Sequence, residues 1–261
     1  MAIQEDPSAE LSAATVSDVT ATAQPGYIDG GRPRDAGRGW EWIVEGYRYF
    51  RRSIGLWILL TVIFFAIVVA VQIVPFVGWI ASTLLVPVLV GGLMAGCQAI
   101  ERGGELELAH LFAGFRMNTA QLMLIGLIGF VLTAVIMIPA MTLIGAGSFF
   151  AAKSGAAVGV PVFGLSTLLG LLIIVALVIP VNMALWFAPA LVMLQNQSAT
   201  VAIKQSFQGC LRNIVPFLIY GVVLLILATI AAIPFGLGWL VLAPVLLGSV
   251  YAAYRDIFFN T

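Results

Sequence analysis

Residues 53–100 read SIGLWILLTVIFFAIVVAVQIVPFVGWIASTLLVPVLVGGLMAGCQAI, a stretch without a single charged side chain. One bilayer crossing needs roughly 20 helical residues, because each adds about 1.5 Å toward a hydrocarbon thickness of about 30 Å. The stretch is long enough for two crossings. Proline, glycine and aromatic residues between Pro75 and Trp79 mark a turn at a membrane interface. The sequence therefore predicts a helical hairpin with helices at 54–74 and 79–98.

Two more apolar blocks, 120–194 and 214–254, follow the same plan. The chain is 61% apolar and 9% charged, whereas a soluble domain carries about 25% charge. Lys153 and several Gly, Ala and Ser residues occupy the middle of the second block, so Ser148 to Val162 is predicted to be an external loop. Pro234 to Trp239 breaks the third block. These patterns predict an all-α, polytopic integral membrane protein with six transmembrane helices arranged as three hairpins.

The N-terminal part of the chain differs in composition. Residues 1–39 are rich in small polar residues, Gly and Pro, so they are expected to form a disordered cytoplasmic tail. From Trp40 to Arg52, apolar residues recur at helical spacing opposite a charged face, which predicts an amphipathic helix in the membrane interface. Two similar segments, near 105–115 and 199–211, precede the other hairpins. The expected domains are thus the tail, 1–39, and a six-helix transmembrane domain, 40–261.

Lys and Arg residues set the predicted orientation, because they collect on the cytoplasmic side of bacterial membrane proteins. Six helices place only Lys153 on the outer side. The other eleven of the twelve basic residues share the side of both termini: Arg32, Arg34, Arg38, Arg48, Arg51, Arg52, Arg102, Arg116, Lys204, Arg212 and Arg255. We therefore expect a multi-pass protein of the bacterial inner membrane with both termini in the cytoplasm.

The three hairpins resemble one another, which indicates an internal repeat. A proline follows the arginine at the start of each hairpin after 23, 23 and 22 residues, at Pro75, Pro139 and Pro234. The second helix of each hairpin carries a further proline followed by small or branched apolar residues. These prolines are Pro87, Pro189 and Pro244. We predict that they kink three helices at similar depth.

Candidate site residues within the spans are neutral, because the predicted helices carry no ionisable side chain of the kind that marks an ion pathway. Asn182, shortly after Pro180, is predicted to hydrogen-bond a neighbouring helix or, alternatively, to line a cavity. Gln72, Pro87, Pro189 and Pro244 are the other candidates for cavity lining or helix packing. The Gly-x-x-x-Gly segment from Gly92 to Gly96 allows close helix approach, either within the chain or between copies.

Chemistry-bearing residues are few. His110 is the only histidine, and a metal site usually needs three or four ligands, so it is interpreted as a solvated interfacial residue. Cys97 and Cys210 are interpreted as small packing residues. No nucleophile motif or phosphate-binding loop is present. We expect no catalytic residues, no cofactor and no bound metal.

Two motifs carry a resemblance to a known family: Gly37 to Ile43 (GRGWEWI) and Ala243 to Gly248 (APVLLG). Together with the Phe-Arg-Arg entry to the first span, they resemble an uncharacterised family of proteobacterial six-helix inner-membrane proteins. More distantly, the chain is similar to the membrane domain fused to some glycerophosphodiester phosphodiesterases. The resemblance implies the six-helix fold but assigns no activity, and the soluble phosphodiesterase domain has no counterpart here.

The sequence favours a non-enzymatic membrane scaffold or assembly partner, because polar machinery is missing from the spans. The alternative is a transporter or channel-like protein for a small amphipathic or lipid-like solute, indicated by the repeat and the helix prolines. The expected partners are membrane lipids and either a membrane-protein partner or a second copy of the chain. A net charge of zero argues against nucleic acid.

Overall fold

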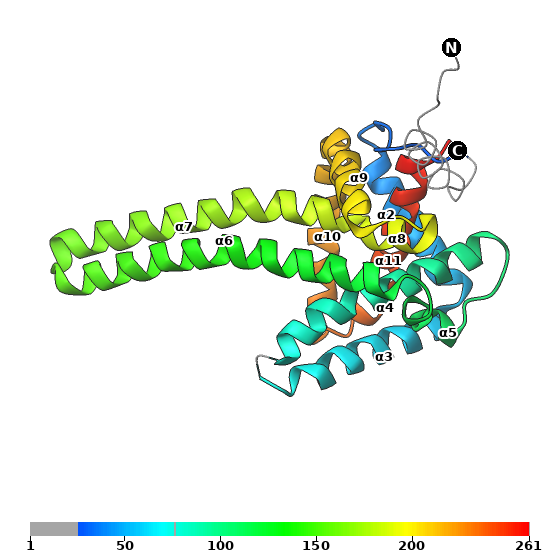
Figure 1. Ribbon diagram of the computed structural model, residues 1–261, viewed down its shortest axis with the longest axis horizontal. Helices are drawn as coiled ribbons and strands as arrows, with labels where there is room; N and C mark the ends of the chain where they lie inside the picture. The colour runs from blue at the N-terminus through cyan, green and yellow to red at the C-terminus, as the bar shows by residue number, and fades with distance from the viewer. Residues whose placement is uncertain (1–25, 76, 261) are drawn as a thin grey trace, which may run out of the picture.

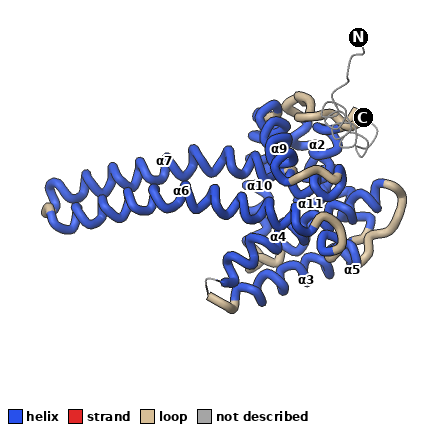
Figure 2. The backbone as a smooth tube through the Cα atoms, in the orientation of Figure 1, coloured by secondary structure: helices blue, strands red, loops and turns tan. Residues whose placement is uncertain are grey.

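The computed structural model describes residues 26–75 and 77–260, and this part of the chain is built from helices (Figures 1 and 2). They are α2 (Arg38–Arg52), α3 (Ile54–Gln72), α4 (Val77–Glu101), α5 (Leu108–Leu111), the 3₁₀ helix η1 (Ala113–Phe115), α6 (Thr119–Lys153), α7 (Ala156–Trp186), α8 (Ala188–Gln195), α9 (Ala199–Arg212), α10 (Ile214–Ala232) and α11 (Trp239–Phe258). Six described segments are long and apolar enough to cross a membrane: α3, α4, α6, the α7–α8 segment Val160–Gln195, α10 and α11. The prediction of an all-α polytopic membrane protein is confirmed.

The first and third hairpins turn where the sequence predicts. Helix α3 stops shortly before Pro75, and α10 stops shortly before Pro234, because proline cannot continue the helical hydrogen bonding. In the third hairpin the chain reverses through Phe235 and Gly236, whose φ angles of 52° and 81° lie in the left-handed region. Glycine adopts this conformation without steric cost, so it suits the turn.

The predicted loop from Ser148 to Val162 is wrong. Helix α6 continues to Lys153 and α7 begins at Ala156, so only Ser154 and Gly155 connect them. Small residues such as Ala, Gly and Ser do not end a helix on their own, and the chain reverses at Gly155, where φ is 69°. The result is a long hairpin of α6 and α7 that projects beyond the other helices (Figure 1). At helical rise the 35 residues of α6 extend about 52 Å, more than a perpendicular span requires.

Residues 26–37, which we call the N-terminal strap, also differ from the prediction of a disordered tail. The backbone N–H of Ile28 donates to the Phe258 carbonyl at 2.8 Å, and that of Arg32 donates to the Ile257 carbonyl at 2.9 Å. The Tyr27 ring stacks on Phe258. These bonds join the strap to the other end of the sequence, and local composition does not encode such a contact. The predicted tail residues 1–25 lie outside the described part of the chain.

The amphipathic helix predicted at 40–52 is present as α2, and its apolar face packs on the third hairpin. A Cβ atom added to Gly39 would lie 2.2 Å from the Pro216 carbonyl oxygen of α10, and one added to Gly46 would lie 2.4 Å from the Val245 carbonyl oxygen of α11. Trp42, between these glycines, is fully buried. The two glycines therefore allow α2 to touch the backbones of both helices.

The three predicted units are α2–α4, α5–α8 and α9–α11, and each unit contacts the next through the same kind of element. The second spanning helix of one unit packs on a short helix near the start of the following unit. In this way α4 meets η1 where Gly114 faces the Val88 carbonyl, and α11 meets α2 where Gly46 faces the Val245 carbonyl. Between the second and third units, the Phe187 N–H donates to the Ser206 hydroxyl of α9 at 2.9 Å. This cyclic order agrees with an internal repeat.

The prolines of the repeat do not occupy identical settings. Pro87 lies inside α4 and Pro244 inside α11, and in both helices the carbonyl of the next residue faces a glycine of the following unit. Pro189 instead stands at the start of α8, after α7 has ended at Trp186. The second unit therefore has a helix break where the others have a proline within a continuous helix. The repeat remains a prediction.

Candidate functional site

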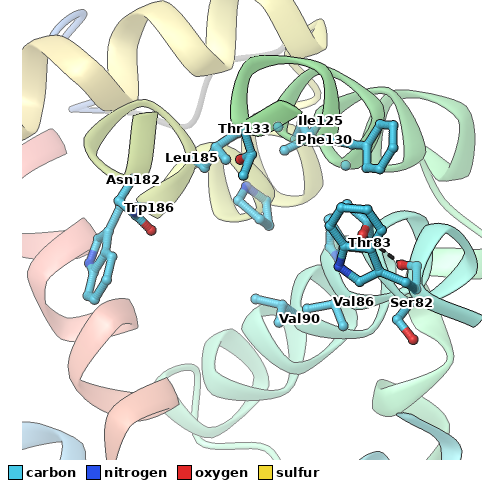
Figure 3. A pocket seen from close by; sticks show the side chains of 15 residues that line it. Ser82, Thr83, Val86, Val90, Ile125, Phe130, Thr133, Asn182, Leu185 and Trp186 are labelled. Atoms are coloured by element: carbon cyan, nitrogen blue, oxygen red, sulfur yellow. Dashed lines mark hydrogen bonds between the residues drawn. The ribbon is translucent and has the colours of Figure 1, made fainter. Parts of the chain in front are cut away.

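A pocket of about 680 Å³ lies between α4, α6, α7 and the start of α8 (Figure 3). Its lining is mainly apolar and aromatic, with a few hydroxyl and amide groups. The lining residues are Trp79, Ser82, Thr83, Val86, Pro87, Val90, Ile125, Gly126, Gly129, Phe130, Thr133, Asn182, Leu185, Trp186 and Pro189. Along α4 it extends from Trp79 to Val90, about 17 Å at helical rise. Trp79 is 55% exposed, so this end of the pocket is open to the membrane.

Backbone features of α4 and α6 fix one edge of the pocket. Pro87 has no N–H to donate to the Thr83 carbonyl one turn earlier. A Cβ atom on Gly126 would lie 2.3 Å from that carbonyl oxygen. Only glycine lets α6 approach α4 so closely. Gly126 and Thr83 both line the pocket, so this contact forms part of its wall. At the other edge the chain bends at Phe187, between α7 and α8.

The polar groups of the pocket fall into two sets. Figure 3 shows Asn182 and Trp186 on one side of the open space and Ser82, Thr83 and Phe130 on the other. Thr83 donates its hydroxyl hydrogen to the Trp79 carbonyl at 2.8 Å, and Asn182 donates its amide hydrogen to the Val178 carbonyl at 2.9 Å. The Ser82 hydroxyl and the Trp186 indole N–H are buried without a hydrogen-bond partner. Buried polar groups usually have partners, so these two are exceptions that call for an explanation.

Three of the five residues singled out from the sequence meet at this pocket: Pro87, Asn182 and Pro189. Asn182 does not bond a neighbouring helix, as the favoured interpretation predicted, because its amide bonds the carbonyl of its own preceding turn. Gln72 lies apart, exposed at the end of α3, and Pro244 is buried in α11. The Gly92–Gly96 motif serves packing within the chain, against the segment around His110.

Sequence reasoning missed Trp186, Ser82 and Trp79. Trp186 follows Asn182 by four residues, so helical spacing places both on one face of α7. That signal was available in the sequence. Ser82 and Trp79 belong to α4, and no sequence signal indicated that α4 packs on α6 and α8.

A second pocket of about 420 Å³ lies on the other side of α7, against α9 and α10, and it shares Asn182 and Trp186 with the first. The Trp186 ring makes edge-on contacts with Phe217 and Tyr220, with ring centroids 6.2 Å apart in both pairs. Cys210 also borders this pocket. Burial raises the pKa of the Cys210 thiol to about 12, so it stays protonated and unreactive at neutral pH.

The remaining candidate residues have structural settings. Nδ1 of His110 accepts the Glu107 backbone N–H at 2.9 Å and so caps the short helix α5. Cys97 and Cys210 are buried free thiols, in line with their interpretation as packing residues. Within residues 26–75 and 77–260, no three His, Cys, Asp or Glu side chains gather in a way that could hold a metal ion.

The chain is similar in sequence to a bacterial membrane protein. It is 29% identical over 215 residues to a probable inner membrane protein of Burkholderia thailandensis, a match that covers 78% of each chain. No protein family and no solved structure matches it. The match and the six apolar helices agree with an inner-membrane protein. They give no support to the similarity with glycerophosphodiester phosphodiesterase membrane domains.

Proposed function

We propose that this protein binds a small amphipathic or lipid-like solute in the pocket between α4, α6 and α7 and carries it within or across the inner membrane. The pocket itself is the observation that supports this proposal. Its volume of about 680 Å³ falls in the usual range for small-molecule sites, roughly 300–1,000 Å³. Such sites are also mostly apolar with a few polar groups, as this lining is. A pocket at Asn182 favours the transporter alternative over a tightly packed scaffold.

The lining favours binding over catalysis. The pocket residues include no Asp, Glu, His, Cys, Lys or Arg. General acid–base chemistry uses such groups, and a serine or threonine hydroxyl without an adjacent base is a weak nucleophile. We therefore propose a carrier and not an enzyme.

Filling the pocket should abolish solute binding. Val86 lines the pocket, so Val86→Trp should occupy it and reduce the bound lipid-sized adducts in native mass spectrometry of detergent-purified protein by about tenfold or more. Val135→Trp is the matched control, because Val135 is 63% exposed on α6 and does not line the pocket. It should retain the adducts.

Equal adducts on both variants would contradict the proposed site. Wild-type protein that carries no lipid adduct but retains a co-purified membrane protein would favour the scaffold function. One observation supports the scaffold as a second candidate. Only 11% of the most apolar stretch of Val160–Gln195 is buried within the chain, whereas 61% of the corresponding stretch of α11 is buried. This surface of α7 is available to lipid, to a second copy or to another membrane protein.

We further propose that both termini lie in the cytoplasm, as the distribution of basic residues indicates. In a background without Cys97 and Cys210, a cysteine replacing Lys153, at the tip of the α6–α7 hairpin, should react with an impermeant thiol reagent in intact cells whose outer membrane has been permeabilised. A cysteine replacing Ala36, which is exposed in the N-terminal strap, should react only after the inner membrane is opened. The reverse pattern of labelling would overturn this orientation.

A further inference from the structure

A separate apolar groove of about 530 Å³ lies between α2 and the ends of α10 and α11 that meet at their turn. We call it the α2 groove. Along α11 it extends from Gly238 to Val245, about 10 Å at helical rise. No lining residue is charged, and the only side-chain polar atoms of the lining are the Trp40 indole nitrogen and the Tyr47 hydroxyl oxygen. Such a lining suits a hydrocarbon chain.

The α2 groove opens at the membrane face where α3 begins and α4 ends. Helix α3 starts at Ile54, directly after α2, and the Arg52 guanidinium group donates to the Ile100 carbonyl near the end of α4 at 2.8 Å. Trp40 and Tyr47, which α2 contributes to the groove, are 53% and 48% exposed. A lipid whose head group lies at the level of α2 can therefore extend a chain into the groove.

One face of α2 joins this apolar lining to a cation. Trp40, Val44, Tyr47 and Arg51 follow one another after four, three and four residues, the spacing of neighbours along a helix surface. The first three line the groove. Arg51 is exposed, and its Cζ atom lies 5.9 Å from the centroid of the Tyr47 ring. The groove therefore has a guanidinium group beside its edge.

The protein does not neutralise this guanidinium group. Within residues 26–75 and 77–260, no carboxylate forms an ion pair with Arg51. Glu41 and Glu45 each follow a residue of the Trp40–Arg51 face by one position, so they lie about 100° around the helix from it. Helix α10 has no charged residue, and those of α11, Arg255 and Asp256, lie at its opposite end. A phosphate beside Arg51 would meet no carboxylate on this face.

We propose that the α2 groove binds an anionic phospholipid of the surrounding membrane, with an acyl chain along α11 and the phosphate on Arg51. A guanidinium group binds phosphate through paired, charge-assisted hydrogen bonds. Arg48, one turn after Val44, adds a second positive charge beside the head group, so a lipid with net negative charge is preferred to a zwitterionic one. This site is distinct from the proposed carrier pocket and does not depend on it.

The test is thermal unfolding of the full chain in mild detergent with added dioleoyl phosphatidylglycerol or dioleoyl phosphatidylcholine, which carry the same acyl chains. A ligand that binds only the folded protein stabilises it. Phosphatidylglycerol should raise the midpoint by about 3 °C or more, and phosphatidylcholine by less than about 1 °C. Arg51→Gln should require about threefold to tenfold more phosphatidylglycerol for the same rise. Arg102→Gln is the matched control, because Arg102 is exposed just after α4, and it should respond as the wild type does.

A second pair of variants tests the groove itself. Val241 lines the groove and is 42% exposed, so Val241→Trp should fill the groove without disturbing the core and should abolish the rise. Val222→Trp is its control, because Val222 is 60% exposed on α10 and does not line the groove. Glycerol 3-phosphate, which has the phosphate without the chains, should produce no rise.

The contrary outcomes are distinct. If the two lipids raise the midpoint equally, or Arg51→Gln responds as Arg102→Gln does, Arg51 does not hold the phosphate. If Val241→Trp responds as Val222→Trp does, the chain does not lie in the groove, and an equal rise with glycerol 3-phosphate would indicate a simple anion site. Val86→Trp should keep the full response. Loss of the response in that variant would mean that the lipid binds in the carrier pocket, and the separate site would be wrong.

Discussion

Replacing Asp256 with alanine should destabilise the folded protein by about 3 kcal/mol, at the lower end of the range for breaking a buried ion pair. The Asp256 carboxylate, with 3% of its side chain exposed, binds Arg34 at 2.5 Å and Arg38 at 2.7 Å. It also accepts the Trp42 indole N–H at 2.9 Å. Alanine would leave that N–H without its acceptor and would remove the carboxylate from both guanidinium groups, although Arg34 keeps its bond to the backbone carbonyl of residue 256 and Arg38 keeps Glu41. Arg34 and Arg38 keep partial contact with solvent, which moderates the loss.

Glu41→Ala is the matched control. Glu41 also pairs with Arg38, but its side chain is 51% exposed, and exposed ion pairs contribute only about 0–1 kcal/mol. Thermal unfolding of the detergent-purified variants, followed by intrinsic fluorescence, should show a large loss of stability for Asp256→Ala and almost none for Glu41→Ala. Similar melting temperatures for the two variants would mean that Asp256 does not anchor the N-terminal strap and α2.

The six spans were predictable from the sequence because charged segments flank each pair of spans and because a bilayer fixes how many apolar residues a crossing requires. The hairpin turn at Gly155 was not. Small residues around Lys153 suggested a loop, but they tolerate a helix, and only Ser154 and Gly155 interrupt it. The order of the N-terminal strap was missed for a different reason. Its bonds reach Ile257 and Phe258, and composition near residue 30 carries no information about those partners.

The candidate site shows the same limit. Pro87, Asn182 and Pro189 stood out because proline and amide side chains are unusual within apolar helices. Their meeting in one pocket depends on how α6 packs against α4 and α7, and one sequence does not specify that packing. The unpartnered Ser82 hydroxyl and Trp186 N–H became visible only with the packing, since serine and tryptophan in a span look ordinary until their surroundings are known.

Gly46→Ala should destabilise the protein by about 2–3 kcal/mol, although alanine favours helix by about 1 kcal/mol over glycine. The added Cβ would lie 2.4 Å from the Val245 carbonyl oxygen and 2.5 Å from the Ser249 backbone nitrogen. Both atoms belong to the backbone of α11, so no side-chain rotation relieves the clash, and overpacking of this kind costs about 1–3 kcal/mol or more. The helices α2 and α11 must then separate.

Separation of α2 from α11 would disturb more than one contact, because Trp42 of α2 donates its hydrogen bond to Asp256 of α11. The same pair of helices also joins the third unit to the first. Gly55→Ala provides the control, since a Cβ at that position of α3 meets nothing within 4 Å. It should leave stability unchanged or raise it by up to about 1 kcal/mol. Thermal unfolding of the two variants in one detergent measures the difference. If Gly46→Ala is as stable as Gly55→Ala, the backbones of α2 and α11 are not in close contact in the membrane, and the first and third units are held together by other contacts.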